Sequence, residues 1–252
     1  MSHKRFAMAA VLLLLVSTPA AVAEEAGWLS DGSWYGRASF GIVPTISSDG
    51  QFVGPTQSVY GGSPVIEMDD GYQYTIAFGR DFLEEFRLEF ELSYLASQSY
   101  AGAVSGTELR VDDIFNVNAD VDSTIVMVNI AYDFDQLNWW TTPYIRGGIG
   151  AAYTEVDAVS SVEFNSAIWQ GTTFEGQTIS SQPFASGSTT EFAWSAAAGL
   201  QREFADRWAL RLEYSFLNRG EALTGVDVNG DSITFSDLES QQVLLGVEWR
   251  FQ

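Results

Sequence analysis

The chain has 252 residues, and its 33 acidic side chains against 12 Lys and Arg give a formal net charge of −21. Nucleic acid and anionic membrane surfaces are therefore poor partners for it. The sequence contains no cysteine, so strand pairing and packing, not disulfide bonds, must hold the fold together. The length suits a single all-β domain.

The start of the chain has the features of a secretory signal peptide. A basic pair, Lys4 and Arg5, precedes an apolar stretch that ends in the small residues Ala21-Val22-Ala23. A buried N-terminal helix is the alternative interpretation, but the small-residue exit favours cleavage. We therefore predict a signal peptide at residues 1–23 and one exported domain at residues 24–252.

Strict alternation of apolar and polar residues is the strongest signal in the rest of the chain. In residues 85–94, for example, Phe86, Leu88 and Phe90 alternate with Arg87 and Glu89, which is the period of a β-strand with two unlike faces. No later segment approaches the roughly 20 apolar residues of a membrane helix. We predict eight strands, at residues 34–42, 72–80, 85–94, 124–134, 144–153, 191–204, 207–216 and 242–251.

The connections between these strands alternate in length. Short ones fall at residues 81–85, 135–142 and 205–207, and long ones at residues 43–71, 95–123, 154–190 and 217–237. An outer-membrane barrel has this order, with short turns in the periplasm and long loops outside. The fold class is thus predicted as all-β, an eight-stranded antiparallel transmembrane β-barrel with long extracellular loops and short periplasmic turns. The loops are rich in Gly, Ser, Thr, Asp and Asn, and we expect mobile segments without a core of their own.

Alternation does not say which face lies inside, and a soluble barrel of the lipocalin type is the alternative. The polar face decides, because a narrow lumen must mix small residues with a few large ones. The small residues are Ser39, Gly41, Ala77, Gly79, Ala131, Gly148, Gly150, Ala197, Gly199 and Gly246.

Aromatic residues gather near both ends of the predicted strands, as the two belts of a membrane barrel do. Ordinary core packing is the alternative explanation for them. The predicted periplasmic belt holds Trp34, Phe82, Phe134, Trp139, Trp140, Phe204, Trp208 and Phe251, and the outer belt holds Tyr72, Tyr94, Tyr153, Phe192 and Phe216.

The polar face also carries charges of nearly balanced sign. Charges enclosed in a narrow lumen must be paired, and the planar guanidinium of Arg can hold a carboxylate with two hydrogen bonds. We predict a lumen closed by Arg–Glu pairs, with a selective ion path or a gate as the alternative. The residues of this lumen polar network are Arg37, Arg87, Glu89, Glu91, Arg146, Arg211, Glu213, Glu248 and Arg250.

Six strand segments carry a resemblance to a known family: WYGRASFG, VNIAYDF, PYIRGGIGAAY, FAWSAAAGLQREF, LRLEYSFLNRGE and VLLGVEWRF. In that order the chain resembles the outer-membrane β-barrel family that includes the transmembrane domain of outer-membrane protein A and the opacity-type surface antigens of Gram-negative bacteria. The resemblance covers the predicted mature chain. It implies a barrel-assembly signal at Val243, Leu245, Val247, Trp249 and Phe251, with the departure that Gln252 follows the terminal aromatic residue.

Catalysis is not expected. Enzymes among outer-membrane barrels imply a His beside a Ser or an Asp, and the mature chain has no His, Lys or Cys. Glu89 with Glu91 or Glu213 is the remaining way to supply two carboxylates. Buried pairing with Arg is the commoner reason for such residues.

A metal site is suggested by oxygen ligands at Asp227, Asn229 and Asp231, the opening spacing of a calcium loop. The match then fails, because Ser232 stands where such loops have Gly and Leu238 stands at the closing carboxylate. A hairpin tip explains the same residues. No dedicated cofactor is expected, although the acidic loops together are predicted to bind calcium or magnesium weakly.

Two functions remain open on this sequence. The first is a structural or envelope role, or adhesion and recognition of an unknown surface ligand, through the acidic extracellular loops. The alternative is a narrow porin-like channel for ions or small molecules, but apolar residues on the polar face are scattered, at Ile125, Met127 and Leu244. The predicted location is the outer membrane, and the predicted partners are its lipid, its lipopolysaccharide and the barrel-assembly machinery.

Overall fold

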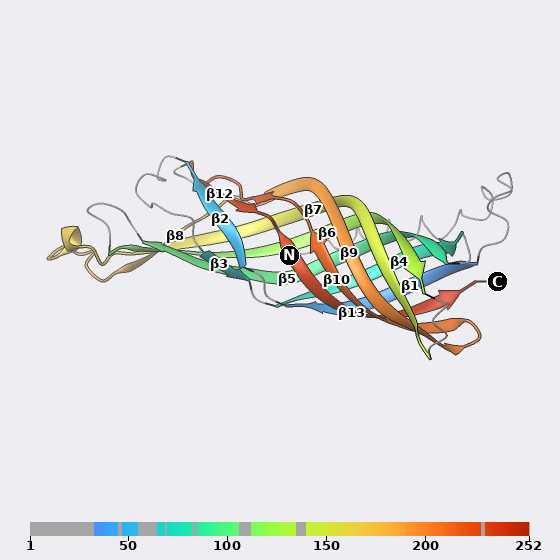
Figure 1. Ribbon diagram of the computed structural model, residues 1–252. Coiled ribbons are helices and arrows are strands. Elements are labelled where there is room, and N and C mark those ends of the chain that lie inside the picture. The colour runs from blue at the N-terminus through green and yellow to red at the C-terminus, as the bar shows by residue number, and fades with distance from the viewer. Residues whose placement is uncertain are drawn as a thin grey trace, which may run out of the picture.

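The computed structural model describes residues 33–44, 47–54, 65–68, 70–82, 85–105, 112–134, 140–227 and 230–251. The predicted signal peptide at residues 1–23 lies outside them. Eight long strands form a barrel (Figure 1). They are β1 (Trp34–Val43), β4 (Gly71–Asp81), β5 (Phe86–Ser105), β6 (Ile114–Asp133), β7 (Thr142–Glu163), β9 (Gly187–Ala205), β10 (Trp208–Asn218) and β13 (Glu239–Arg250).

Hydrogen bonding closes these strands on themselves. The order runs β5, β4, β1, β13, β10, β9, β7 and β6, and β5 also pairs with β6. Every neighbouring pair is antiparallel, and the first and last strands meet with Arg37 opposite Glu248. The predicted eight-stranded barrel is therefore confirmed. Within the described residues, no helix is long and apolar enough to cross a membrane.

The two faces of each strand differ as the alternation predicts. Apolar side chains on the outer face are open, including Phe40 at 46%, Leu88 at 50% and Leu245 at 53% exposure. The charged residues that alternate with them, such as Arg37 and Glu89, are buried in the lumen. A soluble barrel would have the opposite arrangement, so the outer face is suited to lipid.

Aromatic side chains pack together at both rims of the outer face. At the short-turn rim, Trp34 stacks on Phe78 with ring centroids 4.9 Å apart, and Trp249 meets Phe251 at 4.5 Å. At the other rim, Phe40 lies 5.9 Å from Tyr72. Such belts hold a membrane barrel at the two interfaces of the bilayer. Trp139 lies outside the described residues.

The long loops have a core of their own, so the expectation of coreless loops is wrong. β5, β6 and β7 run on beyond the barrel, and four short strands pair in series beside them, in the order β11, β12, β2, β3 and β5. These are β2 (Ser47–Val53), β3 (Val65–Met68), β11 (Ala222–Leu223) and β12 (Ser232–Ser236). We call the described residues of 44–70, 95–123, 154–191 and 217–238 the cap; they include these short strands and the extensions of β5 to β7.

Inward-facing side chains of the cap form one apolar cluster. Its members are Tyr100, Val117, Ala119, Val121, Val156, Ala158, Phe184, Ala222, Ile233, Phe235 and Leu238. Outward-facing residues between them include the polar Asp120 and Asp157, beside exposed Val159 at 50% and Leu223 at 40%. The apolar face therefore changes from outside in the barrel to inside in the cap, although β6 and β7 keep the same alternation throughout. Water in place of lipid around the cap explains this exchange.

Backbone hydrogen bonds close the cap around its core. Phe184 donates to Ala158 O of β7 at 3.0 Å, and Ala185 donates to Val226 O at 3.2 Å. Gly225 donates in return to Ala185 O at 2.8 Å, which joins the β7 side to the β11 side. The cap thus covers the long-loop end of the lumen. β8 (Thr178–Pro183) pairs with β7 at the far end of the molecule (Figure 1).

Candidate functional site

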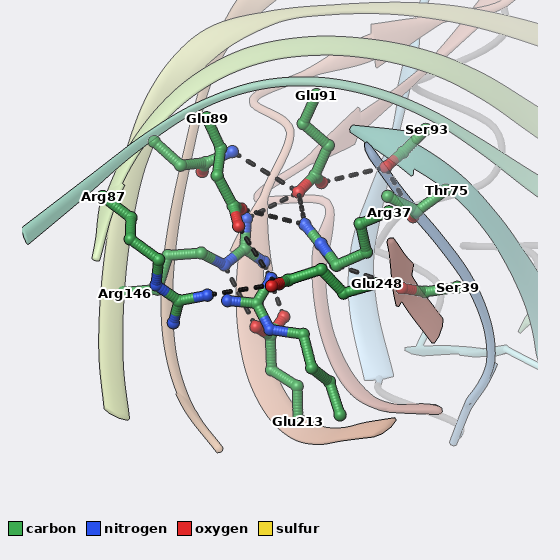
Figure 2. Close-up of polar contacts among 12 residues, drawn as sticks. Arg37, Ser39, Thr75, Arg87, Glu89, Glu91, Ser93, Arg146, Glu213 and Glu248 are labelled. Carbon is green, nitrogen blue, oxygen red and sulfur yellow. Dashed lines mark hydrogen bonds and ion pairs between the residues drawn. The ribbon is translucent and has the colours of Figure 1, made fainter. Parts of the chain in front are cut away.

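The charged residues of the lumen form one connected network (Figure 2). Arg37 of β1 reaches across to β5, where its Nη2 lies 3.1 Å from Glu89 Oε2 and 2.8 Å from Glu91 Oε2. All three side chains are at most 4% exposed. The remaining guanidinium end, Nη1, donates to Ser39 Oγ at 3.1 Å. Alternation places these residues on the lumen face of their strands, and strand pairing in the barrel brings them together.

Arg146 of β7 extends this network to β10. Its Nη1 lies 2.6 Å from Glu91 Oε2, while Nη2 and Nε hold the two oxygens of Glu213 at 2.6 and 3.1 Å. Tyr144 donates its hydroxyl to the same Glu213 carboxylate at 2.9 Å. This is the fork arrangement that makes Arg–carboxylate pairs strong and directional.

A second layer lies nearer the short turns. Arg87 bonds Asp133 at 2.6 Å, and Arg211 bonds Glu89 at 2.7 Å. Glu248 lies 3.5 Å from both guanidinium groups. The ring of Tyr144 supports them, since the guanidinium carbons of Arg87 and Arg211 stand 5.1 and 4.8 Å from its centroid.

Eight of the nine residues predicted for the network lie buried in the lumen, at 5% exposure or less. Arg250 does not, because its strand ends there and its side chain is 30% exposed at the short-turn rim. It bonds Glu248 at 3.1 Å and approaches Asp81 and Glu203 at 3.8 Å.

Sequence reasoning missed several members of the network. Tyr35 donates to Glu89 at 2.7 Å, Asp133 pairs with Arg87, and Asn129 donates to Glu91 at 3.4 Å. The signal was available, because Tyr35 and Tyr144 each lie two residues before a lumen arginine and so share its face.

Glycines on the lumen face make room for the two tyrosines. A side-chain carbon at Gly79 would collide with the ring of Tyr35, and one at Gly199 would collide with the ring of Tyr144. The predicted mixture of small and large lumen residues therefore has a local cause. Each ring fills the space above a glycine of a neighbouring strand.

A neutral zone with polar and apolar walls separates the charged network from the cap. Its apolar wall is a cluster, so Ile125 and Met127 are not scattered as predicted; the members are Ile125, Met127, Ala152, Ala193 and Leu217. Thr75 and Ser93 share a hydrogen bond of 2.8 Å, and Ser93 also donates to Glu91 at 3.0 Å. A cavity of about 10 Å³ lies here, and its lining includes Ser195 and Gln242. This volume is about that of one water-sized probe.

Arg219 links three strands of the barrel at the end that the cap covers. It is fully buried, and it donates to Ser123 Oγ of β6 at 2.8 Å and to Gln98 Oε1 of β5 at 2.7 Å. Its own backbone nitrogen bonds Leu238 O at 3.0 Å. The residue therefore connects the segment after β10 to two strands of the opposite side. Nothing in the sequence pattern distinguished it.

Two of the predicted metal residues, Asp227 and Asp231, are hydrogen-bonded to each other. Asp231 donates its backbone nitrogen to Asp227 Oδ1 at 2.9 Å, and Asp227 donates its own nitrogen to Asp231 O at 2.8 Å. Asn229 lies outside the described residues. Among the residues that are described, no three acidic, His or Cys side chains stand together as a metal site. Cation binding here stays a prediction.

Four residues of the predicted assembly signal lie on the outer face of β13, and the fifth, Phe251, directly follows this strand. Four of them are 39–53% exposed, and the fifth packs its ring against Trp249. They are Val243, Leu245, Val247, Trp249 and Phe251. Phe251 also donates its backbone nitrogen to Trp34 O at 2.7 Å, which anchors the chain end to β1.

An apolar outer face, two aromatic rims and a closed ring of eight strands define a transmembrane β-barrel. The family described as "Outer membrane protein beta-barrel domain" matches residues 8–251, so the chain belongs to this family and its location is the outer membrane. The short turns are then periplasmic, and the cap is extracellular.

The solved structures to which the chain is similar are distant in sequence. The outer membrane protein OprG of Pseudomonas aeruginosa is 15% identical, with coverage of 88% of this chain and 96% of that chain and a TM-score of 0.51. Neisserial surface protein A is 14% identical, covering 87% and 99%, with a TM-score of 0.44. Ail of Yersinia pestis is 12% identical, covering 86% and 98%, with a TM-score of 0.34. No curated protein matches the sequence.

Proposed function

We propose that the protein is a non-enzymatic outer-membrane barrel with a closed lumen, which presents its folded acidic cap for an envelope role or for adhesion and recognition. The observation that carries this proposal is the chain of ion pairs across the lumen. Arg37 joins Glu91, Glu91 joins Arg146, and Arg146 joins Glu213, so three arms of the network connect β1, β5, β7 and β10.

Closure follows from the energetics of those pairs. Separating a buried ion pair costs several kcal/mol, because each charge is left in the lumen without its partner. A permeating ion would have to replace those interactions to pass. The apolar core of the cap adds a second obstacle, which includes Ile233 and Phe235 at 0% exposure. Conductance of the refolded chain in a planar bilayer tests the proposal, and a silent wild type is the expected result.

A narrow porin-like channel is the second candidate. The observation in its favour is the cavity beside the network, whose lining includes Glu91 and Arg146. A rearrangement of their pair would join the cavity to the charged layer and give ions a path. Steady conductance that changes when Arg87 or Glu213 is replaced by Ala would make this function the leading one.

The partners of the barrel follow from its surface charge. Extracellular acidic residues and anionic lipopolysaccharide repel each other, and divalent cations between them remove the repulsion. We expect calcium or magnesium to stabilise the barrel in lipopolysaccharide-containing detergent. Coincident thermal unfolding curves with and without a chelator would contradict this. Insertion by the barrel-assembly machinery through the β13 signal is part of the same proposal.

A further inference from the structure

The far end of the cap is a folded aromatic tip, residues 164–177, between β7 and β8 (Figure 1). The rings of Phe164, Trp169 and Phe174 pack together with centroids 4.9 to 5.8 Å apart. Two backbone bonds close its base, from Phe164 N to Gln177 O at 3.1 Å and from Gly176 N to Phe164 O at 2.9 Å. The tip therefore has a defined shape.

A buried carboxylate from another hairpin fixes that shape. Asp113, just before β6, is fully buried. Its Oδ1 accepts hydrogen bonds from the backbone nitrogens of Asn165 and Ser166, at 2.9 Å each. Its second oxygen accepts Trp169 Nε1 at 2.9 Å. The backbone nitrogen of Asp112 donates to Ser166 Oγ at 3.2 Å. The buried carboxylate of Asp113 thus holds the tip in place.

The tip leaves apolar side chains in water. Ile168 is 41% exposed and Phe174 is 43% exposed. The segment between β7 and β8 that carries them lies at the end of the molecule opposite the periplasmic turns (Figure 1). An ordered apolar cluster at such a position is typical of an interaction site. Aromatic anchors of this kind contribute most of the binding energy in protein interfaces.

Among the described residues, the charges around the tip are all acidic. Asp112 and Glu175 are exposed and Glu163 is partly exposed beside it. In the described part of the cap, the one basic residue is Arg219, which is buried. Exposed acidic residues of the cap include Asp70, Asp120, Asp157, Glu191, Glu221 and Asp237. An anionic bilayer or a second copy of this chain would be repelled, whereas a cationic surface would be attracted.

We propose that the tip is the docking site for a cationic amphipathic protein segment, whose apolar side covers Ile168 and Phe174 while its basic residues face Glu163 and Glu175. This inference rests on the recognition role under the proposed function and names the chemistry of the partner. Apolar contact supplies the affinity, and the acidic cap raises the rate of encounter in a salt-dependent way.

The test uses the full barrel in nanodiscs of zwitterionic lipid, with empty nanodiscs as the blank. The probe is a fluorescent synthetic helix of Leu and Lys that carries the two residue types on opposite sides, and its isomer with the residues mixed around the helix is the control. Anisotropy gives Kd for the wild type, for Ile168→Ser with Phe174→Ser, and for Glu163→Gln with Glu175→Gln. Val226→Ser, another exposed apolar residue of the cap at 58%, is the matched variant.

We expect both double variants to weaken binding by about tenfold or more, and the Glu163→Gln with Glu175→Gln variant also to reduce the salt dependence of binding. Val226→Ser should bind as the wild type does, and the mixed isomer should bind less tightly. Equal binding of the isomer, or unchanged binding by the Ile168 and Phe174 double variant, would overturn the proposal. If the peptide does not bind at the tip and the wild type shows no conductance in a bilayer, only the docking site is contradicted. Steady conductance by the wild type would instead contradict the proposed closed-lumen function.

Discussion

Arg146 holds Glu213 by two hydrogen bonds, from Nη2 to Oε1 at 2.6 Å and from Nε to Oε2 at 3.1 Å. Its remaining nitrogen bonds Glu91, so one guanidinium neutralises carboxylates on two different strands. Arg146 thereby joins β7 to both β5 and β10 across the lumen. Lysine has a single charged centre and cannot reproduce these three contacts.

Replacing Arg146 by Ala should lower the free energy of unfolding by about 3–5 kcal/mol, because Glu91 and Glu213 then stay buried without this partner. The free energy of unfolding of Arg146→Lys should lie between those of the wild type and Arg146→Ala. Urea unfolding in lipid vesicles, followed by tryptophan fluorescence, measures the difference. Arg202→Ala is the matched control, since that guanidinium lies over exposed Trp140 at the rim. A loss at Arg146 no larger than at Arg202 would contradict the assignment.

Adding one methyl group at Gly79 should cost about 1–3 kcal/mol. The new carbon meets the ring of Tyr35, which must move away from Glu89 and lose its hydrogen bond. Gly147→Ala is the control, because the nearest atom to its added carbon is a backbone oxygen 3.9 Å away. Equal unfolding midpoints for the two variants would show that Tyr35 does not fill the space at Gly79.

Phe235→Ala should loosen the cap and leave the membrane barrel folded. The ring is fully buried and lies 5.1 Å from that of Tyr100, and such truncations cost about 3–5 kcal/mol. We expect faster hydrogen exchange and proteolysis in β11 and β12, with unchanged circular dichroism of the barrel. Val226→Ala, at an exposed position, should change neither rate. Unchanged protection in the Phe235 variant would mean that the cap core does not order these strands.

Acid should release the aromatic tip. Burial raises the pKa of Asp113, but hydrogen bonds from Trp169, Ser166 and Asn165 outweigh it and hold that pKa below the ordinary value of 3.8. A carboxylate with a lowered pKa stabilises the fold above its ordinary pKa, and this contribution is lost as the pH falls through the lowered value. The tip should therefore be ordered at neutral pH and loosen below about pH 4.

The fluorescence of Trp169 reports this transition, taken as the difference between the wild type and Trp169→Phe at each pH. Asp113→Asn should show the loosened signal already at neutral pH, because the amide lacks the charge that the three donors stabilise. If the fluorescence of Trp169 depends on pH in the same way with Asp113 and with Asp113→Asn, Asp113 is not the titrating group.

Alternation was sufficient to predict all eight barrel strands, because lipid outside and a polar lumen inside impose opposite chemistry on neighbouring residues. The same alternation continues through residues 114–123 of β6, but with the apolar residues on the other face. A pattern that requires apolar residues on one face of the strand therefore predicts only its membrane-spanning part. The cap was missed for this reason, and short strands such as β11 have too few residues to show a period.

The composition of the lumen network was largely predictable, and its pairing was not. Parity alone places Arg37, Glu91 and Arg146 in the lumen. Their contacts join residues 54 and 55 positions apart in the sequence, and they depend on the register and width of the closed barrel. Arg219 was missed because it follows the last residue of β10, where alternation no longer indicates a direction.

Conductance of the refolded mature chain in a planar bilayer tests the closed lumen most directly, alongside Arg87→Ala and Glu213→Ala variants that remove one partner from each layer of the network. We expect no steady current from the wild type, and current only from a variant in which a pair is broken. Steady wild-type conductance that shifts with these substitutions would contradict the closed lumen and make the lumen charges part of a transport path.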